Sequence, residues 1–449
     1  MGASGIWLLL VGLPIHSSPP LPPSQDTLTL DRAISVALRE NPEVRQAAAA
    51  QSRAHADRRA NLGAFLPSVD GSLGFSRTSF RTITFPAPEG SAERLDQPLD
   101  GVTKSSSQGL NFGWDLLRGG SRFAELARSG AETTAADRRV TAAERRVVAE
   151  VKRRYYEALK QQRLVEVAER QLAARRQDLE ETRRRYELAA LTRADLLGAE
   201  IQLGDAELAL LDARDLYRQA IRDLRAQMGV EEEAATEEVV LGDVGSLPSS
   251  GGLEVGALVR RAFASEPELA AIQADLAAAS ASLWMGRAGY LPNIRLGYGI
   301  RRSESLGPEG SFFVFDPSNR SYSFSVSVSW NLFDGFQREQ QTAQASAARR
   351  DAQARLLQRR LEVESDVRNF TDEIRRRAER LAVQDRNLEL ARERLAVARE
   401  QYRLGAITFF QLQTAIGEVT TKESQVIQER YEYLKAWASL EERVGEAAR

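Results

Sequence analysis

The chain contains no cysteine and only two histidines among its 449 residues. The absence of cysteine excludes disulfides, thiolate metal sites, thiol nucleophiles and a lipid-modified N-terminal cysteine. With His16 and His55 alone, histidine-based catalysis has almost nothing to work with. The 61 basic and 63 acidic residues nearly cancel, so the net charge does not indicate a nucleic-acid partner. We therefore expect a protein that is not an enzyme and has no cofactor or metal site.

Long apolar runs are also scarce. Residues 6–15 form an apolar run of about the length of a signal-peptide core, and a proline-rich stretch follows this run. We expect residues 1–26 to be an export signal, although the basic residues that usually open such a segment are missing. No other segment approaches the roughly 20 apolar residues that a membrane helix needs. If this chain spans a membrane, helices do not form the crossing.

The chain contains two copies of one unit, an internal duplication that decides its organisation. Segments 33–44 and 63–75 match 258–269 and 288–300, both at a shift of 225 positions. At a shift of 216, segments 112–120, 186–197 and 216–229 match 328–336, 402–413 and 432–445. We expect a first repeat over 27–229, an acidic, Gly/Ser-rich linker over 230–254 and a second repeat over 255–445.

Two alternating strands are predicted in each repeat, over about 66–77 and 106–117, and over about 291–302 and 321–333. The last is the clearest: in "SYSFSVSVSWNLF" serine or asparagine occupies every odd position from 321 to 331, and an apolar or aromatic residue occupies every even one. Period-two alternation predicts a strand with one polar and one apolar face.

The rest of each repeat is predicted to be helical. Residues 121–186 and 337–402 contain no proline and a single glycine, Gly130. Apolar residues recur every seven positions along both segments and along the return segments that follow breaks at 189–193 and 405–409, which indicates antiparallel coiled-coil hairpins. One long helix is expected beside two shorter ones stacked end to end. The predicted class is mainly α with β-hairpins.

The apolar strand faces have no evident core to join, because the flanking helices run away from them. Lipid would cover such a face, whereas the serine-rich face suits a wet lumen. We expect these residues to face lipid: Phe112, Trp114, Phe324, Val326, Val328 and Trp330. Open sheet edges do not occur in hydrocarbon, so four strands per chain require several chains to close one barrel. The alternation does not fix how many chains take part.

The sequence resembles the TolC-type outer-membrane efflux family over about residues 27–445. The resemblance is carried by "ALRENPEV" and "AFASEPEL", "FLPSV" and "YLPNI", "WDLLRGG" and "WNLFDGF", and by "YELAALTRADLLGA" and "YRLGAITFFQLQTA". It implies a homotrimer with a twelve-stranded outer-membrane barrel continued by a helical tunnel through the periplasm. The implied function is a passive exit duct of a tripartite efflux or type I secretion system, with a periplasmic adaptor and an inner-membrane pump as partners.

The resemblance also implies roles for the hairpin tips. It assigns adaptor contact to Ala189, Leu191, Thr192, Gly405, Ile407 and Thr408, and the lumen or gate to Asp195, Gln411 and Thr414. The family prefers glycine where Ala189 stands. The alternative for the tips is that they only stabilise a turn, and Asp195 also suits the positive end of a helix dipole.

Two questions stay open at the level of sequence. A soluble periplasmic coiled-coil scaffold would share the helical pattern and need no membrane. Within the channel interpretation, drugs, metals and proteins are all candidate cargo, because the pump chooses it. The predicted lumen lacks a His, Met or Cys cluster, which argues mildly against dedicated soft-metal transport.

Overall fold

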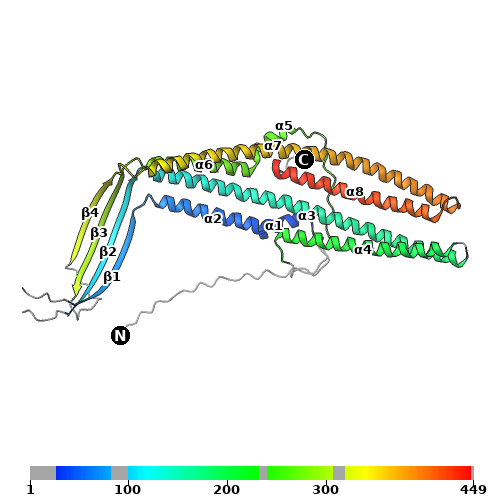
Figure 1. The fold of residues 1–449 in the computed structure, drawn as a ribbon, viewed down its shortest axis with the longest axis horizontal. Coiled ribbons are helices and arrows are strands. Elements are labelled where there is room, and N and C mark those ends of the chain that lie inside the picture. The colour runs from blue at the N-terminus through cyan, green and yellow to red at the C-terminus, as the bar shows by residue number, and fades with distance from the viewer. Residues whose placement is uncertain (1–26, 82–99, 190, 232–239, 307–318, 446–449) are drawn as a thin grey trace, which may run out of the picture.

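The computed structural model describes residues 27–81, 100–189, 191–231, 240–306 and 319–445, and the expected export signal lies outside them. The described chain is elongated, with a sheet at one end and long helices running away from it (Figure 1). The elements are α1 (Leu30–Glu40), α2 (Pro42–Gly63), β1 (Ser68–Arg81), β2 (Asp100–Arg118), α3 (Ser121–Glu187), α4 (Arg193–Met228), α5 (Val255–Ser265), α6 (Pro267–Ala288), β3 (Asn293–Leu306), β4 (Arg320–Ser329), α7 (Gln337–Arg403) and α8 (Phe409–Val444).

The second helix of each repeat begins at a proline. The Asn41 side chain caps α2 by accepting a hydrogen bond from the backbone N–H of Glu43 at 2.8 Å, and Pro42 occupies the first turn. α6 starts in the same way at Pro267. A proline suits this position because its φ is already helical and its missing N–H would have had no intrahelical partner.

The four strands form one antiparallel sheet in the order β1-β2-β3-β4. β2 of the first repeat pairs with β3 of the second, with Phe112 opposite Tyr298. The two predicted hairpins are therefore halves of a single sheet.

The strands end at other residues than the alternation suggested. β1 and β2 continue beyond the expected limits, and Thr78 pairs with Thr103 there. Both faces carry mostly polar residues in this stretch, so backbone pairing continues where the alternation stops. β4 is shorter than expected and ends at Ser329, before residue 333.

The helices follow the predicted stacking. α3 and α7 have 67 residues each, α2 and α6 have 22, and α4 and α8 have 36. In Figure 1, α2 and α4 lie end to end along α3, and α6 and α8 lie end to end along α7. α3 also packs against α6 and α8, which joins the two repeats side by side.

The seven-residue apolar pattern marks the buried seams, as predicted for coiled coils. Its buried members on α7 are Val367, Ile374, Leu388 and Leu395, and on α8 they are Leu412, Tyr433 and Leu440. Near the tips, Leu395 and Ala398 of α7 pack with Leu412 and Ala415 of α8. The heptad spacing keeps one stripe of each helix against its neighbour.

The described part of the segment between the repeats packs on the helices. The Tyr155 hydroxyl donates to the carbonyl of Gly242 at 2.6 Å and also contacts that of Leu28, next to an isolated parallel bridge between Leu28 and Leu241. Burial raises the pKa of Tyr155 to about 12, which keeps the hydroxyl a hydrogen-bond donor at neutral pH. From the second repeat, Tyr433 donates to the carbonyl of Pro248 at 2.6 Å.

A buried ion pair fastens α3 to α8. Lys152 Nζ lies 2.9 Å from a Glu441 carboxylate oxygen, and the side chains are 9% and 5% exposed. Removing one partner of such a pair leaves a buried charge, which is strongly destabilising.

Candidate functional site

One face of the sheet is apolar across all four strands. Val69, Phe112, Tyr298 and Phe324 lie opposite one another in one row. Trp114, Leu296 and Val326 form the next row towards the helices. The exposed fractions of the residues predicted to face lipid are 37% for Phe112, 42% for Trp114, 72% for Phe324, 57% for Val326, 66% for Val328 and 60% for Trp330. The face is thus an unpartnered apolar surface within the described chain, of the kind that marks an interaction or membrane surface.

Two tryptophans mark the base of this face. The Trp114 indole N–H donates to the carbonyl of Phe65 at 3.0 Å, and that of Trp330 donates to the carbonyl of Tyr290 at 3.2 Å. Trp330 directly follows β4 rather than lying within it. Tryptophans with an apolar body and a satisfied N–H are typical of membrane–water interfaces.

The opposite face is polar and lined by small side chains. Ser68 lies opposite Gly113, and Gly297 opposite Ser325. A Cβ placed on Gly297 would lie 2.7 Å from the Ser325 hydroxyl oxygen, too close for a larger residue without a shift. Small hydroxylated residues of this kind suit a water-filled lumen.

Two tight connections between helices form the far end of the molecule. α3 gives way to α4 at one tip and α7 to α8 at the other (Figure 1). Each turn contains a left-handed residue, Ala189 with φ +54° and Gly405 with φ +71°. The left-handed region costs a non-glycine residue roughly 1–2 kcal/mol. The first tip therefore holds strain that the second avoids.

Matching capping boxes start the return helices. The Thr192 backbone N–H donates to the Asp195 carboxylate at 2.9 Å, and that of Thr408 donates to the Gln411 side-chain oxygen at 2.9 Å. Hydrogen bonds from the Thr192 hydroxyl and backbone hold the pKa of Asp195 below its usual range. Asp195 thus stays ionised at neutral pH while it caps its helix.

The remaining predicted tip residues differ in exposure. Leu191 and Ile407 are half-buried, and Ile407 packs against the apolar cluster between α7 and α8. The Thr414 hydroxyl donates to the carbonyl of Phe410 at 3.0 Å. Whether Asp195, Gln411 and Thr414 line a constriction stays a prediction.

The most exposed apolar side chains of the tips were missed by sequence reasoning. Leu188, Leu404 and Phe410 are 80%, 68% and 79% exposed. Leu188 and Leu404 occupy equivalent positions of the two repeats, one residue before the left-handed residue. Large apolar side chains directly beside the breaks at 189–193 and 405–409 are the sequence signal that points to them.

The two tips are joined within one chain. The guanidinium carbon of Arg185 lies 5.3 Å from the centre of the Tyr402 ring, and its Nη1 is 3.4 Å from the Tyr402 hydroxyl. The Gln413 amide nitrogen donates to the Asp178 carboxylate at 3.2 Å. These contacts hold the first hairpin against the second.

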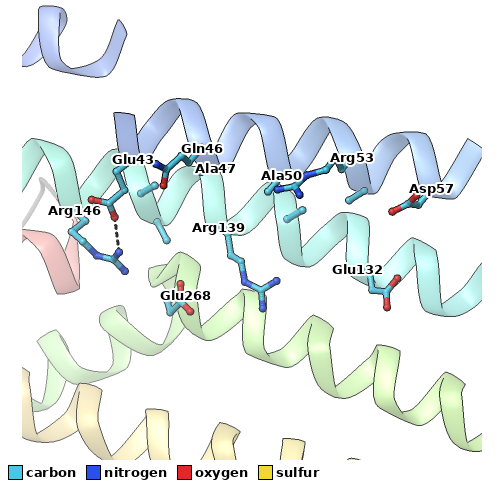
Figure 2. A pocket seen from close by; sticks show the side chains of 14 residues that line it. Glu43, Gln46, Ala47, Ala50, Arg53, Asp57, Glu132, Arg139, Arg146 and Glu268 are labelled. Atoms are coloured by element: carbon cyan, nitrogen blue, oxygen red, sulfur yellow. Dashed lines mark hydrogen bonds and ion pairs between the residues drawn. The ribbon is translucent and has the colours of Figure 1, made fainter. Parts of the chain in front are cut away.

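A groove of about 700 Å³ lies between α2, α3 and α6 (Figure 2). Alanines of α2 and α3 form much of its lining, and charged residues of both signs surround them. Arg146 lies 2.6 Å from Glu43 across it, and Arg139 pairs with Asp275. We interpret the groove as a solvated seam in the helical wall.

Among the described residues, no helix combines the length and the apolarity needed to cross a membrane.

Comparison with known families decides the classification. Residues 33–230 and 258–446, which correspond to the two repeats, match the family described as outer membrane efflux protein. The chain belongs to this family. The efflux protein is thus an outer-membrane channel that extends into the periplasm, a transport protein and not an enzyme. This confirms the resemblance inferred from sequence and excludes the soluble scaffold.

Relatives and solved structures agree with this classification. Protein CyaE of Bordetella pertussis is 27% identical over 352 residues, which cover 76% of the efflux protein and 70% of CyaE. The CmeC outer membrane channel of Campylobacter jejuni has a TM-score of 0.79 at 13% identity, covering 93% of the efflux protein and 85% of CmeC. VceC of Vibrio cholerae has a TM-score of 0.74 at 20% identity, covering 93% and 96% of the two chains. The structural matches establish the fold, including its long helices and four antiparallel strands.

Proposed function

We propose that the efflux protein assembles as a homotrimer and forms the exit duct for cargo that a periplasmic adaptor and an inner-membrane pump deliver. Channels of this family form trimers. The observation that carries the proposal is the pair of open edges on the described chain. β1 and β4 each pair along one side only, and α7 and the α2–α4 stack flank the helical layer.

The sheet edges require partners if the apolar face lies in lipid. An unpaired backbone amide or carbonyl in hydrocarbon costs several kcal/mol. Three copies of the four-stranded sheet supply twelve strands, and joining β4 of each copy to β1 of the next removes every edge. Eight strands is the smallest size of bacterial outer-membrane barrels, so one chain is too small alone.

The helical edges carry matching apolar stripes. Exposed residues recur every seven positions on α7 as Val383, Leu390 and Val397, and Leu404 continues the series directly after the helix. The outer edge of α4 exposes Leu197, Ile201, Leu208 and Leu211. A heptad-spaced stripe needs a partner helix, and α4 of a neighbouring copy provides a complementary surface for α7.

A charge placed in the proposed interface between α7 of one copy and α4 of the next is expected to prevent assembly. Leu390→Glu places a charge where full burial of each leucine side chain would stabilise the trimer by about 1.5–3 kcal/mol. We expect loss of the trimer on native gels and in light scattering of the detergent-extracted protein. Arg392→Glu, exposed on the opposite side of α7 from Leu390, is the control and should leave trimers intact. Normal trimers with Leu390→Glu would contradict this interface.

The polar sheet face then lines the water-filled path, and the tips form the periplasmic entrance. The exposed Leu188, Leu404 and Phe410 support docking of the adaptor at the tips, where Ala189, Leu191, Thr192, Gly405, Ile407 and Thr408 also lie. Asp195, Gln411 and Thr414, in the first turns of α4 and α8, are proposed to line the gate.

Changes at the second tip are expected to stop transport without preventing assembly. Gly405→Val forces a β-branched residue to φ +71°, which distorts the turn, and Phe410→Ser removes an exposed apolar contact without strain. In a strain that lacks the chromosomal copy, we expect both variants to form trimers but to lose export of the system's cargo. Ala189→Gly, which relieves the left-handed alanine, should preserve export. Unchanged export by both variants would remove the docking role.

A further inference from the structure

Three arginines and one aspartate meet where β2 gives way to α3. Asp115 and Arg118 lie at the end of β2, Arg122 lies in the first turn of α3, and Arg295 lies opposite Asp115 on β3. The Asp115 carboxylate is 3.5 Å from Arg122, 3.5 Å from Arg295 and 3.8 Å from Arg118. One carboxylate faces three guanidinium groups, so two positive charges (three minus one) remain uncompensated within this cluster.

Arg122 is buried and only partly satisfied. Its side chain is 8% exposed. Its Nη1 donates to the backbone carbonyl of Asp115, and its guanidinium carbon lies 5.6 Å from the centre of the Phe65 ring. Its Nε has no hydrogen-bond partner among the described residues. A buried donor without an acceptor is unfavourable, and the Nε of Arg338 at the equivalent position of the second repeat lacks a hydrogen-bond partner in the described chain as well.

The second repeat builds the same corner with a different charge. Arg338 is equivalent to Arg122, and its Nη1 donates to the backbone carbonyl of Asn331 at 3.0 Å. Asp334 stands where the first repeat has Arg118, and its carboxylate lies 2.9 Å from the Nε of Arg338. Both corners keep one carboxylate, but the second repeat has a single arginine at these positions where the first has Arg118 as well as Arg122.

A cavity of about 250 Å³ opens beside the first corner. It is lined by all four charged residues, by Ser68 and Gly113 and by the end of α2. Ser68, Gly113 and Arg295 belong to the polar face of the sheet. α3 begins here after Gly120, which provides no side-chain cap, so the helix dipole adds positive potential. The cavity, the excess positive charge and the polar side chains therefore lie at the same place.

We propose that this cavity binds a soluble anion through a carboxylate or phosphate group that takes the place of the Asp334 carboxylate of the second repeat. The donors are the guanidinium groups of Arg118, Arg122 and Arg295, which line the cavity and suit planar or tetrahedral oxyanions. The inference rests on the proposed function, because the polar face has to line the water path for the site to meet cargo. Each copy then places a positively charged binding site at the base of the barrel, in the water path that anionic cargo would follow.

The test is a calorimetric titration of the detergent-purified protein with inorganic phosphate. Arg118→Asp copies the second repeat and supplies a carboxylate at this position from the chain itself. We expect it to weaken phosphate binding at least about tenfold and to leave trimers intact. Arg301→Gln, on the same face further from the corner, is the control and should keep the wild-type affinity. A second titration, with added short-chain phosphatidylglycerol, should give the same affinity for phosphate, because the site faces water and not lipid.

Each outcome decides the matter. No phosphate binding by the wild type, or equal affinity in the wild type and Arg118→Asp, overturns the proposal. Competition by phosphatidylglycerol overturns the soluble anion in favour of a lipid headgroup. Light scattering on the same sample keeps the two proposals separate: a monomer that binds phosphate contradicts the trimer alone, and a trimer that does not bind it contradicts the site alone.

Discussion

Val326→Arg is expected to remove the protein from the outer membrane. Val326 lies on the apolar sheet face, opposite Leu296, and is 57% exposed in the isolated chain. A cation on the lipid face of a barrel costs up to about 2–4 kcal/mol, and less the closer it lies to the membrane–water interface, and a trimer would bear this cost three times. We expect the variant to be absent from membrane fractions and degraded, as measured by immunoblotting of fractionated envelopes.

The neighbouring residue provides the matched control. Ser325 lies on the opposite face, across from Gly297, where no side chain competes for space. Ser325→Arg adds the same charge one position away, so it should insert and form trimers at normal levels. Equal envelope levels for the two variants would contradict the assignment of the apolar face to lipid.

Lys152→Met is expected to lower the free energy of unfolding by about 3–5 kcal/mol. The substitution leaves the Glu441 carboxylate, 5% exposed, without the Lys152 ammonium that lies 2.9 Å away. A lower midpoint of thermal unfolding, followed by circular dichroism of the helices in detergent, checks this.

Removing both charges is the control for this ion pair. Lys152→Met combined with Glu441→Leu should recover much of the lost stability, because the double variant buries neither charge at this place. A double variant as unstable as Lys152→Met would show that packing, and not the ion pair, sets the effect.

The long helices and their seams were predictable because their signals are local and repeated. A stretch without proline, an apolar residue every seven positions and a break of a few residues specify a helical hairpin without long-range information. Asn41-Pro42 likewise fixed the start of α2 through cap chemistry. The alternation around Val326 predicted a strand and its two faces.

Other features depend on contacts that the local pattern does not encode. The limits of β1 and β2 escaped prediction because Thr78 and Thr103 pair through the backbone in a stretch without alternation. Leu390 and Val397 belong to a second seven-residue series on α7. The sequence alone does not separate it from the series of Leu388 and Leu395, and only the burial of the latter shows which of the two stays exposed. Arg295 reaches Asp115 through the pairing of β2 with β3, whose register joins residues of different repeats.

The glycine–serine rows of the polar sheet face have a consequence for what travels past them. Hypothetical Cβ atoms on Gly109 and Gly299 would lie 2.8 Å and 2.9 Å from the hydroxyl oxygens of Ser72 and Ser323. Longer polar side chains share these rows, because Arg301 lies opposite Gly109 and Asn111 lies opposite Gly299. In the proposed channel, a passing solute would therefore meet glycine backbone, serine hydroxyl groups and these two longer side chains next to one another.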